Sequence, residues 1–218
     1  MKQNLRPQVE QGGEWEEGYA DMLAWLVDLK RGLSPDRERA LWEYGRLLYT
    51  ASERTNLISP GDRKSLVIKH LVPALCMGFV LALVPHRVVL DFGSGAGLPG
   101  IPLKVLFPGS RFILVESRRR RANFLREVVR RLNLSQVEVH NCRIEYLHPK
   151  LLGVADVVVS RAVTEIGGLQ DWVKPVLKPH GVAITTLDAQ RGYGRSSGVL
   201  LRRKCRVFGQ THWFGMLR

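Results

Sequence analysis

The sequence has few cysteines and lacks both a long apolar run and an apolar leader. Its three cysteines, Cys76, Cys142 and Cys205, lie far apart and form no C-x-x-C pair, which argues against a disulfide scaffold and predicts reduced thiols. The six histidines and three cysteines show no spacing typical of metal ligands, so we expect no metal site. Residues 1–18 contain no apolar core, and no apolar run reaches membrane-spanning length. We therefore expect a cytoplasmic protein without a membrane partner.

The length of the chain suits one main domain with an accessory segment. Its 218 residues are enough to bury one full core but few for two complete domains. Hydrophobic residues make up 45% of the chain and charged residues 24%, which is typical of a globular protein. We expect a helical segment over residues 1–80, a main domain over residues 81–218, and a monomer.

Acidic residues are scarce over most of the chain, whose formal net charge is +13. Residues 1–40 carry eight acidic and six basic side chains, so the remainder carries 27 basic against 12 acidic. No acidic residue follows Asp188. This balance favours a polyanionic partner, most often nucleic acid, although binding to anionic lipid or a role in solubility produces the same excess.

The first third of the chain has the periodicity of helices. In residues 18–32 the apolar side chains recur on one helical stripe. Ser34 and Pro35 have the form of an N-cap followed by proline at the first helical position. A third helix is predicted over residues 62–77, with Pro73 as a kink.

From residue 87 onward, short β-branched runs alternate with helical segments, as in a parallel sheet with crossover helices. The predicted strands are residues 87–92, 111–116, 136–140, 155–160 and 182–187. The predicted helices are roughly residues 99–107, 119–132 and 165–177. Residues 191–204 are predicted to form a mobile loop or a weak helix, and the final runs RVFG and HWFGML an edge hairpin. The fold class is therefore α/β.

A glycine-rich turn follows the first predicted strand. Gly93, Gly95 and Gly97 permit positive φ angles and allow a ligand to approach the backbone. Glu116, 23 residues after Gly93, ends the second predicted strand, where a carboxylate accepts hydrogen bonds from ribose hydroxyls. The arrangement predicts a nucleoside site.

The glycine spacing alone leaves the type of nucleoside open. Gly95, Gly97 and Gly100 also satisfy G-x-G-x-x-G, the dinucleotide fingerprint. A dinucleotide-binding domain usually carries its fingerprint on its first strand and continues into a second, substrate-handling half. Here helices precede the motif and about 120 residues follow it. This context favours S-adenosylmethionine over a dinucleotide.

The motif in residues 91–103, DFGSGAGLPGIPL, resembles the signature of the bacterial RsmG (GidB) family, the 16S ribosomal RNA guanine-N7 methyltransferases. The likeness covers roughly residues 40–187. Further matches are Thr55-Asn56-Leu57, Lys69-His70, Glu116-Ser117, Arg120-Arg121, Phe124-Leu125, Arg143-Ile144-Glu145 and Ser160-Arg161-Ala162. The resemblance implies a Rossmann-like class I S-adenosylmethionine-dependent methyltransferase over residues 81–218, with a mostly parallel seven-stranded sheet. The implied partner is 16S rRNA or the small ribosomal subunit, an assembly intermediate included.

The resemblance also implies a set of residues around S-adenosylmethionine. Glu116 would bind the ribose, Ile144 and Glu145 the adenine edge, and Arg161 would lie at the mouth of the pocket. The whole implied set is Gly93, Gly95, Leu98, Glu116, Ser117, Ile144, Glu145 and Arg161. Simpler interpretations stay open: Leu98 and Ile144 as core, Glu145 as a solvated charge, and Arg161 as the partner of a surface carboxylate.

Candidates for the RNA side of the site are polar or basic. Asn56 and His70 are candidates for the guanine pocket, although a turn asparagine and a helix-packing histidine are ordinary alternatives. Cations are disfavoured at the start of a helix, so the arginines at 118–121, Arg118 and Arg119 among them, indicate phosphate contacts or a solvated helix end. The basic residues after Asp188, with Tyr193 among them, are a second candidate RNA surface: Arg191, Arg195, Arg202, Arg203, Lys204, Arg206 and Arg218. Guanine N7 carries a free lone pair, so no catalytic acid or base is predicted.

Two departures from the family pattern concern the substrate. Leu187-Asp188-Ala189 stands where the family commonly has a lysine-glycine pair, and the acidic residue often found a few positions after the histidine is absent, near Pro73. Two alternative functions therefore remain: a methyltransferase of another substrate, and a ribosome-associated module that binds S-adenosylmethionine without activity.

Overall fold

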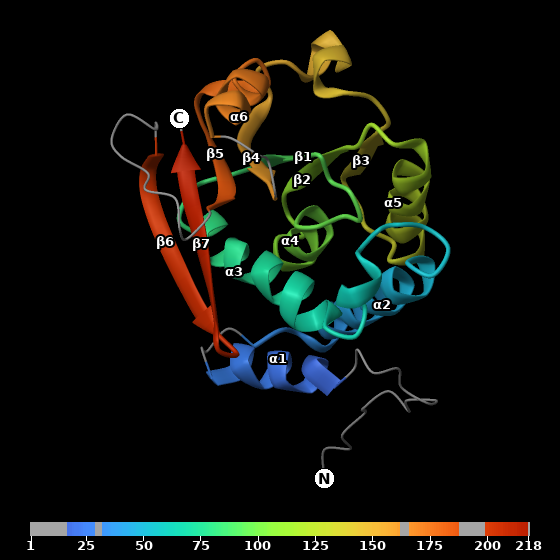
Figure 1. Cartoon of the computed structure of the whole chain (residues 1–218). Coiled ribbons are helices and arrows are strands. Elements are labelled where there is room, and N and C mark those ends of the chain that lie inside the picture. Colours follow the sequence, from blue (N-terminus) through green and yellow to red (C-terminus); the bar gives the residue numbers. More distant parts are fainter. Residues whose placement is uncertain (1–16, 29–31, 162–165, 188–198, 218) are drawn as a thin grey trace.

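A seven-stranded sheet organises the chain in the computed structural model, which describes residues 17–28, 32–161, 166–187 and 199–217 (Figure 1). The strand order is β3-β2-β1-β4-β5-β7-β6. The strands are β1 Val88–Phe92, β2 Arg111–Val115, β3 Val137–His140, β4 Ala155–Ser160, β5 Leu177–Leu187, β6 Val199–Val207 and β7 Gln210–Leu217. β1 to β5 run parallel, whereas β7 is antiparallel to both β5 and β6. The prediction of a mostly parallel seven-stranded sheet is confirmed.

The edge hairpin is also confirmed, but its first strand was partly mispredicted. β6 begins at Val199, so residues 199–204 are strand and not loop or weak helix; residues 191–198 lie outside the described residues. Charged side chains obscured the alternation of the strand. Phe208 and Gly209 both have positive φ, 48° and 71°, as a tight hairpin turn requires.

Helices α1 Glu17–Asp28 and α2 Pro35–Ala51 agree with the predicted helical start of the chain. The helix expected over residues 62–77 is confirmed from residue 66 onward, because the π-helical turn continues directly into α3, but its first residues are not part of that helix. The segment forms a 3-10 turn at Pro60–Asp62, a π-helical turn at Val67–Leu71, and α3 at Val72–Leu81. Pro73 lies directly after the π-helical turn, in the first turn of α3. The remaining helices are α4 Gly100–Leu106, α5 Arg119–Arg131 and α6 Ile166–Val173.

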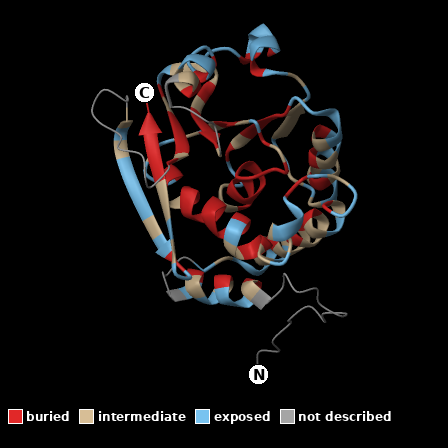
Figure 2. Cartoon of the chain, viewed as in Figure 1, coloured by how far each residue is buried: buried red, intermediate tan, exposed pale blue. Residues whose placement is uncertain are grey.

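The two faces of the sheet are covered unequally. α1 to α5 pack on one face, and α6 with the 3-10 turns Ile144–Tyr146 and Pro149–Leu151 packs on the other (Figures 1 and 2). Alternate residues of each strand enter the two cores: Val89 faces α1 to α5, whereas Leu90 faces α6. In the described part of the chain, no helix is both long and apolar enough to cross a membrane.

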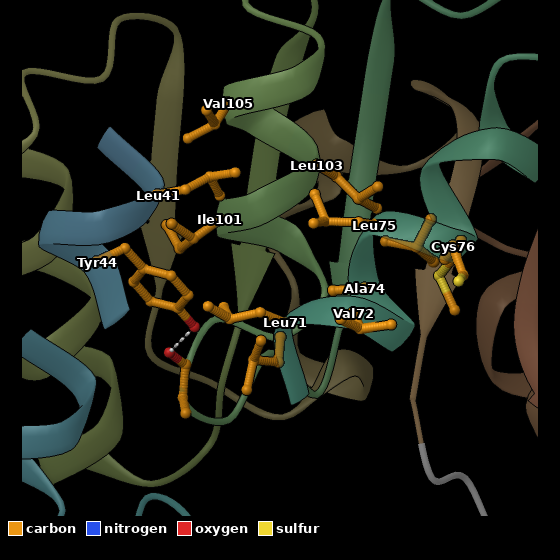
Figure 3. Close-up of a cluster of buried hydrophobic side chains, with 14 of the residues drawn as sticks. Leu41, Tyr44, Leu71, Val72, Ala74, Leu75, Cys76, Ile101, Leu103 and Val105 are labelled. Carbon is orange, nitrogen blue, oxygen red and sulfur yellow. Dashed lines mark hydrogen bonds between the residues drawn. The ribbon is translucent and has the colours of Figure 1, made fainter. Parts of the chain in front are cut away.

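The helices before β1 share their core with the sheet. Leu41 and Tyr44 of α2, together with α3 and α4, form the buried cluster in Figure 3. The hydroxyl of Tyr44 donates a 3.0 Å hydrogen bond to the backbone oxygen of Ala96 in the glycine turn. α2 is thereby tied to the turn after β1. The division after residue 80 stays a prediction.

Candidate functional site

The glycine turn lies at the carboxyl end of β1, where the strand order reverses between β2 and β4. Such a switch point is where open α/β sheets bind ligands. The backbone N–H groups of Gly93 and Ser94 both donate to the oxygen of Val115 at 3.0 Å. The φ angles of Gly93, Gly95 and Gly97 are +71°, +58° and +96°, a region that L side chains rarely adopt.

Two glycines of the motif serve packing. A Cβ on Gly97 would lie 2.6 Å from Ile101 Cγ1, and one on Gly100 would collide with Asp91 Oδ2. Gly100 also donates its N–H to that oxygen at 3.0 Å. By contrast, no atom of the described residues lies within 4 Å of the Cβ position of Gly93. Within the described part of the chain Gly93 therefore faces open space, where a ligand has room.

The carboxylate of Glu116 closes the turn from the end of β2. It is 5% exposed. Its Oε2 accepts a 2.8 Å hydrogen bond from the N–H of Gly95, and its Oε1 accepts one of 2.7 Å from the N–H of Arg118. A carboxylate has about four acceptor positions, so two remain for a ligand. The side chain is held in one orientation.

A cavity of about 360 Å³ opens beside this carboxylate. Its lining residues come from the ends of β1 and β2, the start of α5, the segment after β3, and α6: Phe92, Gly93, Val115, Glu116, Ser117, Arg118, Arg121, Cys142, Arg143, Ile144, Glu145 and Trp172. Gly93, Glu116, Ser117, Ile144 and Glu145 of the predicted cofactor set are thus brought together.

The other predicted cofactor residues lie outside that lining. Gly95 reaches the site through its N–H bond to Glu116. Leu98 is 5% exposed within the core of α1 to α5. Ile144, which does line the cavity, is 7% exposed and packs in the α6 core.

Two aromatic residues that line the cavity, Phe92 and Trp172, were not predicted as site residues from the sequence. The rings of Phe92 and Trp172 are 6.3 Å apart, and Trp172 is 44% exposed although it belongs to α6. A half-exposed tryptophan beside a cavity suits a planar ligand. A tryptophan in the helix after β4 was the available signal.

Asp91 is the buried charge behind the turn. Its side chain is fully buried, and Oδ1 has no hydrogen-bond partner among the described residues. Burial raises the pKa of this carboxyl to about 7, against the hydrogen bonds from Ser94 and Gly100 and the opposing charge of Arg161. The sequence signal was a lone acid at the end of an apolar strand.

Arg161, placed at the pocket mouth by the resemblance, follows β4 and contacts the N-terminal segment. Its Nη2 lies 2.8 Å from Nδ1 of His70. Burial, with a smaller effect of Arg161, lowers the pKa of His70 to about 4. The imidazole is therefore neutral near pH 7, and because Arg161 can only donate, Nδ1 is the acceptor. Nε2 then carries the proton and faces Asp62 Oδ2 at 3.5 Å.

The predicted RNA-side residues are only partly assembled. Arg121 donates a 2.8 Å hydrogen bond to the backbone oxygen of Asn56, so Asn56 lies close to the cavity. Arg118 and Arg119 are exposed at the start of α5. Arg191 and Arg195 fall outside the described residues.

A family model described as rRNA small subunit methyltransferase G matches residues 37–190. The chain belongs to this family. A relative of that name from Carboxydothermus hydrogenoformans is 38% identical over 157 residues, which cover 70% of this chain and 66% of the relative. One from Pseudomonas aeruginosa is 34% identical over 161 residues, 72% of each chain. The first relatives are matched over 66%, 66% and 60% of their own length.

Solved structures extend the likeness to the fold. The O-methyltransferase TomG of Streptomyces achromogenes has a TM-score of 0.58 at 15% identity, covering 94% of this chain and 98% of that one. TYW2 of P. horikoshii has a TM-score of 0.54 at 16% identity, covering 74% and 63%. At these identities the comparison shows the fold alone, which is that of S-adenosylmethionine-dependent methyltransferases.

The departures from the methyltransferase G pattern have defined places. Leu187 is a buried residue at the carboxyl end of β5, paired with Trp213 of β7. Val72 and Pro73, in the region of the missing acid, are buried at the start of α3. Asp188 and Ala189 lie outside the described residues, so apolar packing is seen only at Leu187, Val72 and Pro73.

Proposed function

We propose that this chain is an S-adenosylmethionine-dependent methyltransferase that modifies N7 of a guanine in 16S rRNA. The observation that carries the proposal is the buried Glu116 carboxylate, fixed by two backbone N–H groups and facing the cavity at the switch point. Membership of the methyltransferase G family supports the reaction and substrate.

The residues around the cavity fit S-adenosylmethionine. The free acceptor positions of Glu116 suit the two ribose hydroxyls. Ile144 and Trp172 offer apolar and aromatic surface for adenine, and Glu145 an acceptor at its edge. Open space at Gly93 leaves room for the rest of the ligand.

When bound, S-adenosylmethionine supplies a methyl group on a positively charged sulfur. Attack by N7 of guanine requires no proton removal, so the chain contributes orientation and electrostatics rather than a base. Tyr44 and Gly100 hold the turn by their hydrogen bonds to Ala96 and Asp91. Arg161 and His70 connect the end of β4 to the N-terminal helices at 2.8 Å.

We assign the RNA side of the site to polar and basic residues near the cavity. Arg118 lines it, Arg119 is the next residue on α5, and Asn56 adjoins it through Arg121. His70 is included because it contacts Arg161 at the end of β4. The proposal includes Arg191 and Arg195, which rest on the sequence alone. It also includes action on the small ribosomal subunit, a cytoplasmic location and a monomeric state.

The proposal is tested in two steps. Calorimetry is expected to detect S-adenosylmethionine but neither NAD nor NADP. Transfer of a labelled methyl group to 16S rRNA or 30S particles from cells that lack the protein is then measured, and the nucleotide is mapped by mass spectrometry. NAD binding without S-adenosylmethionine binding would reverse the cofactor assignment, and methylation of a different atom or RNA would reverse the substrate.

A second candidate is a ribosome-associated module that binds S-adenosylmethionine without catalysis. The observation that favours it is Leu187-Asp188-Ala189, which stands where the family commonly has a lysine-glycine pair. Cofactor binding together with no methyl transfer to either substrate would select this candidate.

A further inference from the structure

The outer strands of the sheet carry a concentration of basic side chains around one tryptophan. Arg202 and Lys204 of β6 lie over the ring of Trp213 in β7, with the Arg202 Cζ 5.1 Å and the Lys204 Nζ 5.8 Å from its centroid. Arg202, Lys204 and Arg206 are exposed, and Trp213 is half-buried. In Figure 2 most of β6 has the colour of exposed residues. We call these four residues the β6–β7 patch.

The side chains of the patch lie on one face of the sheet. Leu201, Cys205 and Val207 pack into the core of α1 to α5, so the alternate residues of β6 point to the opposite, α6 side. Leu217 of β7 packs into the α6 core, and Trp213, four residues earlier, shares its side. The patch therefore lies on the sparsely covered face of the sheet.

The patch concentrates basic side chains on one face of two neighbouring strands. Neither β6 nor β7 contains an acidic residue, and like charges two residues apart on one face repel each other. Basic side chains on an edge strand also protect against pairing with other sheets. Edge protection does not require a tryptophan beneath the cations, whereas binding to a polyanion with planar rings uses both.

The register of the sheet connects the patch to the candidate site. Ser160, which precedes Arg161, pairs with Thr185 of β5, Thr185 pairs with Gly215 of β7, and Gly215 pairs with Arg202. The row crosses three strand spacings, roughly 15 Å, and β1, the nearest strand that lines the cavity, is one spacing further, roughly 20 Å from β6. Leu187 at the carboxyl end of β5 pairs with Trp213. The patch thus lies toward the same end of the sheet as the cavity, at a distance that a few nucleotides span.

We propose that the β6–β7 patch binds single-stranded RNA next to the methylated nucleotide, with a base stacked on Trp213 and phosphates against Arg202 and Lys204. This inference rests on the proposed RNA substrate. A single strand suits the patch because unpaired bases expose the ring faces that an aromatic side chain recognises. An anionic membrane also attracts cations beside an interfacial tryptophan, so vesicle binding is a separate outcome of the test.

The test compares three variants with a matched control. R202Q/K204Q removes two cations from the patch, Trp213→Leu removes the ring, and Trp213→Phe keeps an aromatic face. The control, K150Q/K174Q, removes two exposed cations elsewhere, near the amino ends of β4 and β5. A labelled 12-nucleotide oligoadenylate is titrated at several salt concentrations, and cofactor affinity and melting temperature are measured for every variant.

R202Q/K204Q is expected to lower the slope of log affinity against log salt by about 1.4, or 0.7 for each phosphate that the variant no longer neutralises, while the control keeps the wild-type slope. Trp213→Leu is expected to weaken binding about tenfold at each salt concentration without changing the slope, in the lower range for a stacked base. Trp213→Phe should restore most of the affinity. Cofactor affinity should stay at the wild-type value throughout.

Oligoadenylate binding by R202Q/K204Q and Trp213→Leu equal to that of the control would overturn the inference and assign the cations to edge protection. Loss of binding to phosphatidylserine vesicles without loss of RNA binding would overturn it in favour of a membrane. The oligoadenylate assay requires no methyl transfer. A wild-type protein without methyl transfer would therefore contradict the proposed function, whereas the oligoadenylate assay alone tests RNA binding by the patch.

Discussion

Nη2 of Arg161 lies 2.8 Å from Nδ1 of His70, a residue 91 positions earlier in the chain. The contact joins the end of β4 to the π-helical turn before α3. Because a guanidinium only donates, this geometry requires a neutral imidazole. The contact between the end of β4 and the N-terminal segment therefore depends on a neutral His70.

His70 should make the fold sensitive to acid. Its pKa is about 4 in the folded chain and about 6.5 when unfolded, so the unfolded state binds more protons between these values and stability falls as pH drops from 6.5 to 4. The loss is up to about 3 kcal/mol. His70→Gln keeps an acceptor for Arg161 and should lose less over this window in urea unfolding. Equal losses in both proteins would contradict the assignment.

Asp91 should have the opposite effect. Burial raises its pKa to about 7, above the unfolded value, so its contribution to stability is present below about pH 3.8 and is lost as pH rises through 7. Asp91→Asn keeps an acceptor for the N–H of Gly100 and never ionises. The variant should melt at a higher temperature than the wild type at pH 8, by a difference equivalent to up to about 4 kcal/mol. The difference should shrink at pH 5, and a constant difference would exclude titration as its cause.

The parts of the site that sequence predicted are local. Gly93, Gly95 and Glu116 belong to adjoining elements, β1, the turn and β2, so their spacing alone brings them together. Sequence could not place the Tyr44 hydroxyl on Ala96, 52 positions away, or Arg161 on His70, because these contacts depend on how helices pack on the sheet.

The misassigned segments have a similar physical explanation. In β6 the exposed arginines hid the alternation of Leu201, Cys205 and Val207 toward the core. Before α3, the apolar run has no caps that separate a 3-10 turn, a π-helical turn and an α-helix. Local pattern predicted the kind of element in most of the sheet, whereas tertiary packing decided these boundaries.

Glu116→Ala should weaken cofactor binding. Loss of the carboxylate removes the ribose acceptor and leaves the N–H groups of Gly95 and Arg118 unpaired, at a cost of about 1.5–3 kcal/mol for charged hydrogen bonds. Calorimetry should therefore show a dissociation constant higher by about one to two orders of magnitude. Glu145→Ala, which removes an exposed carboxylate on the same cavity, should cost less. An unchanged affinity in Glu116→Ala would move the ribose elsewhere.

Gly100→Ala should destabilise the fold severely. The added methyl group would collide with Asp91 Oδ2 and lie 2.6 Å from Leu114 Cδ2, and overpacking of this kind costs about 1–3 kcal/mol. Gly168→Ala in α6 is the matched control, because among the described residues no atom lies within 4 Å of its Cβ position. It should gain up to about 1 kcal/mol from helix propensity. Urea unfolding of the two variants should shift in opposite directions, and equal shifts would contradict the packing argument.

The arginines that begin α5 should lower the stability of the fold and strengthen RNA binding. Arg119 and Arg120 are exposed in the first turn of the helix, where each cation opposes the helix dipole by about 0.3–1 kcal/mol. R119Q/R120Q should therefore melt at a higher temperature than the wild type. If these side chains meet phosphates, the same variant should lower the salt slope of RNA binding by about 1.4.

The control R130Q/R131Q changes charge equally at the other end of α5, where cations are favourable and pair with Glu127. That control should lose stability and keep the RNA slope. A more stable R119Q/R120Q with the wild-type slope would show that these arginines are a solvated helix end.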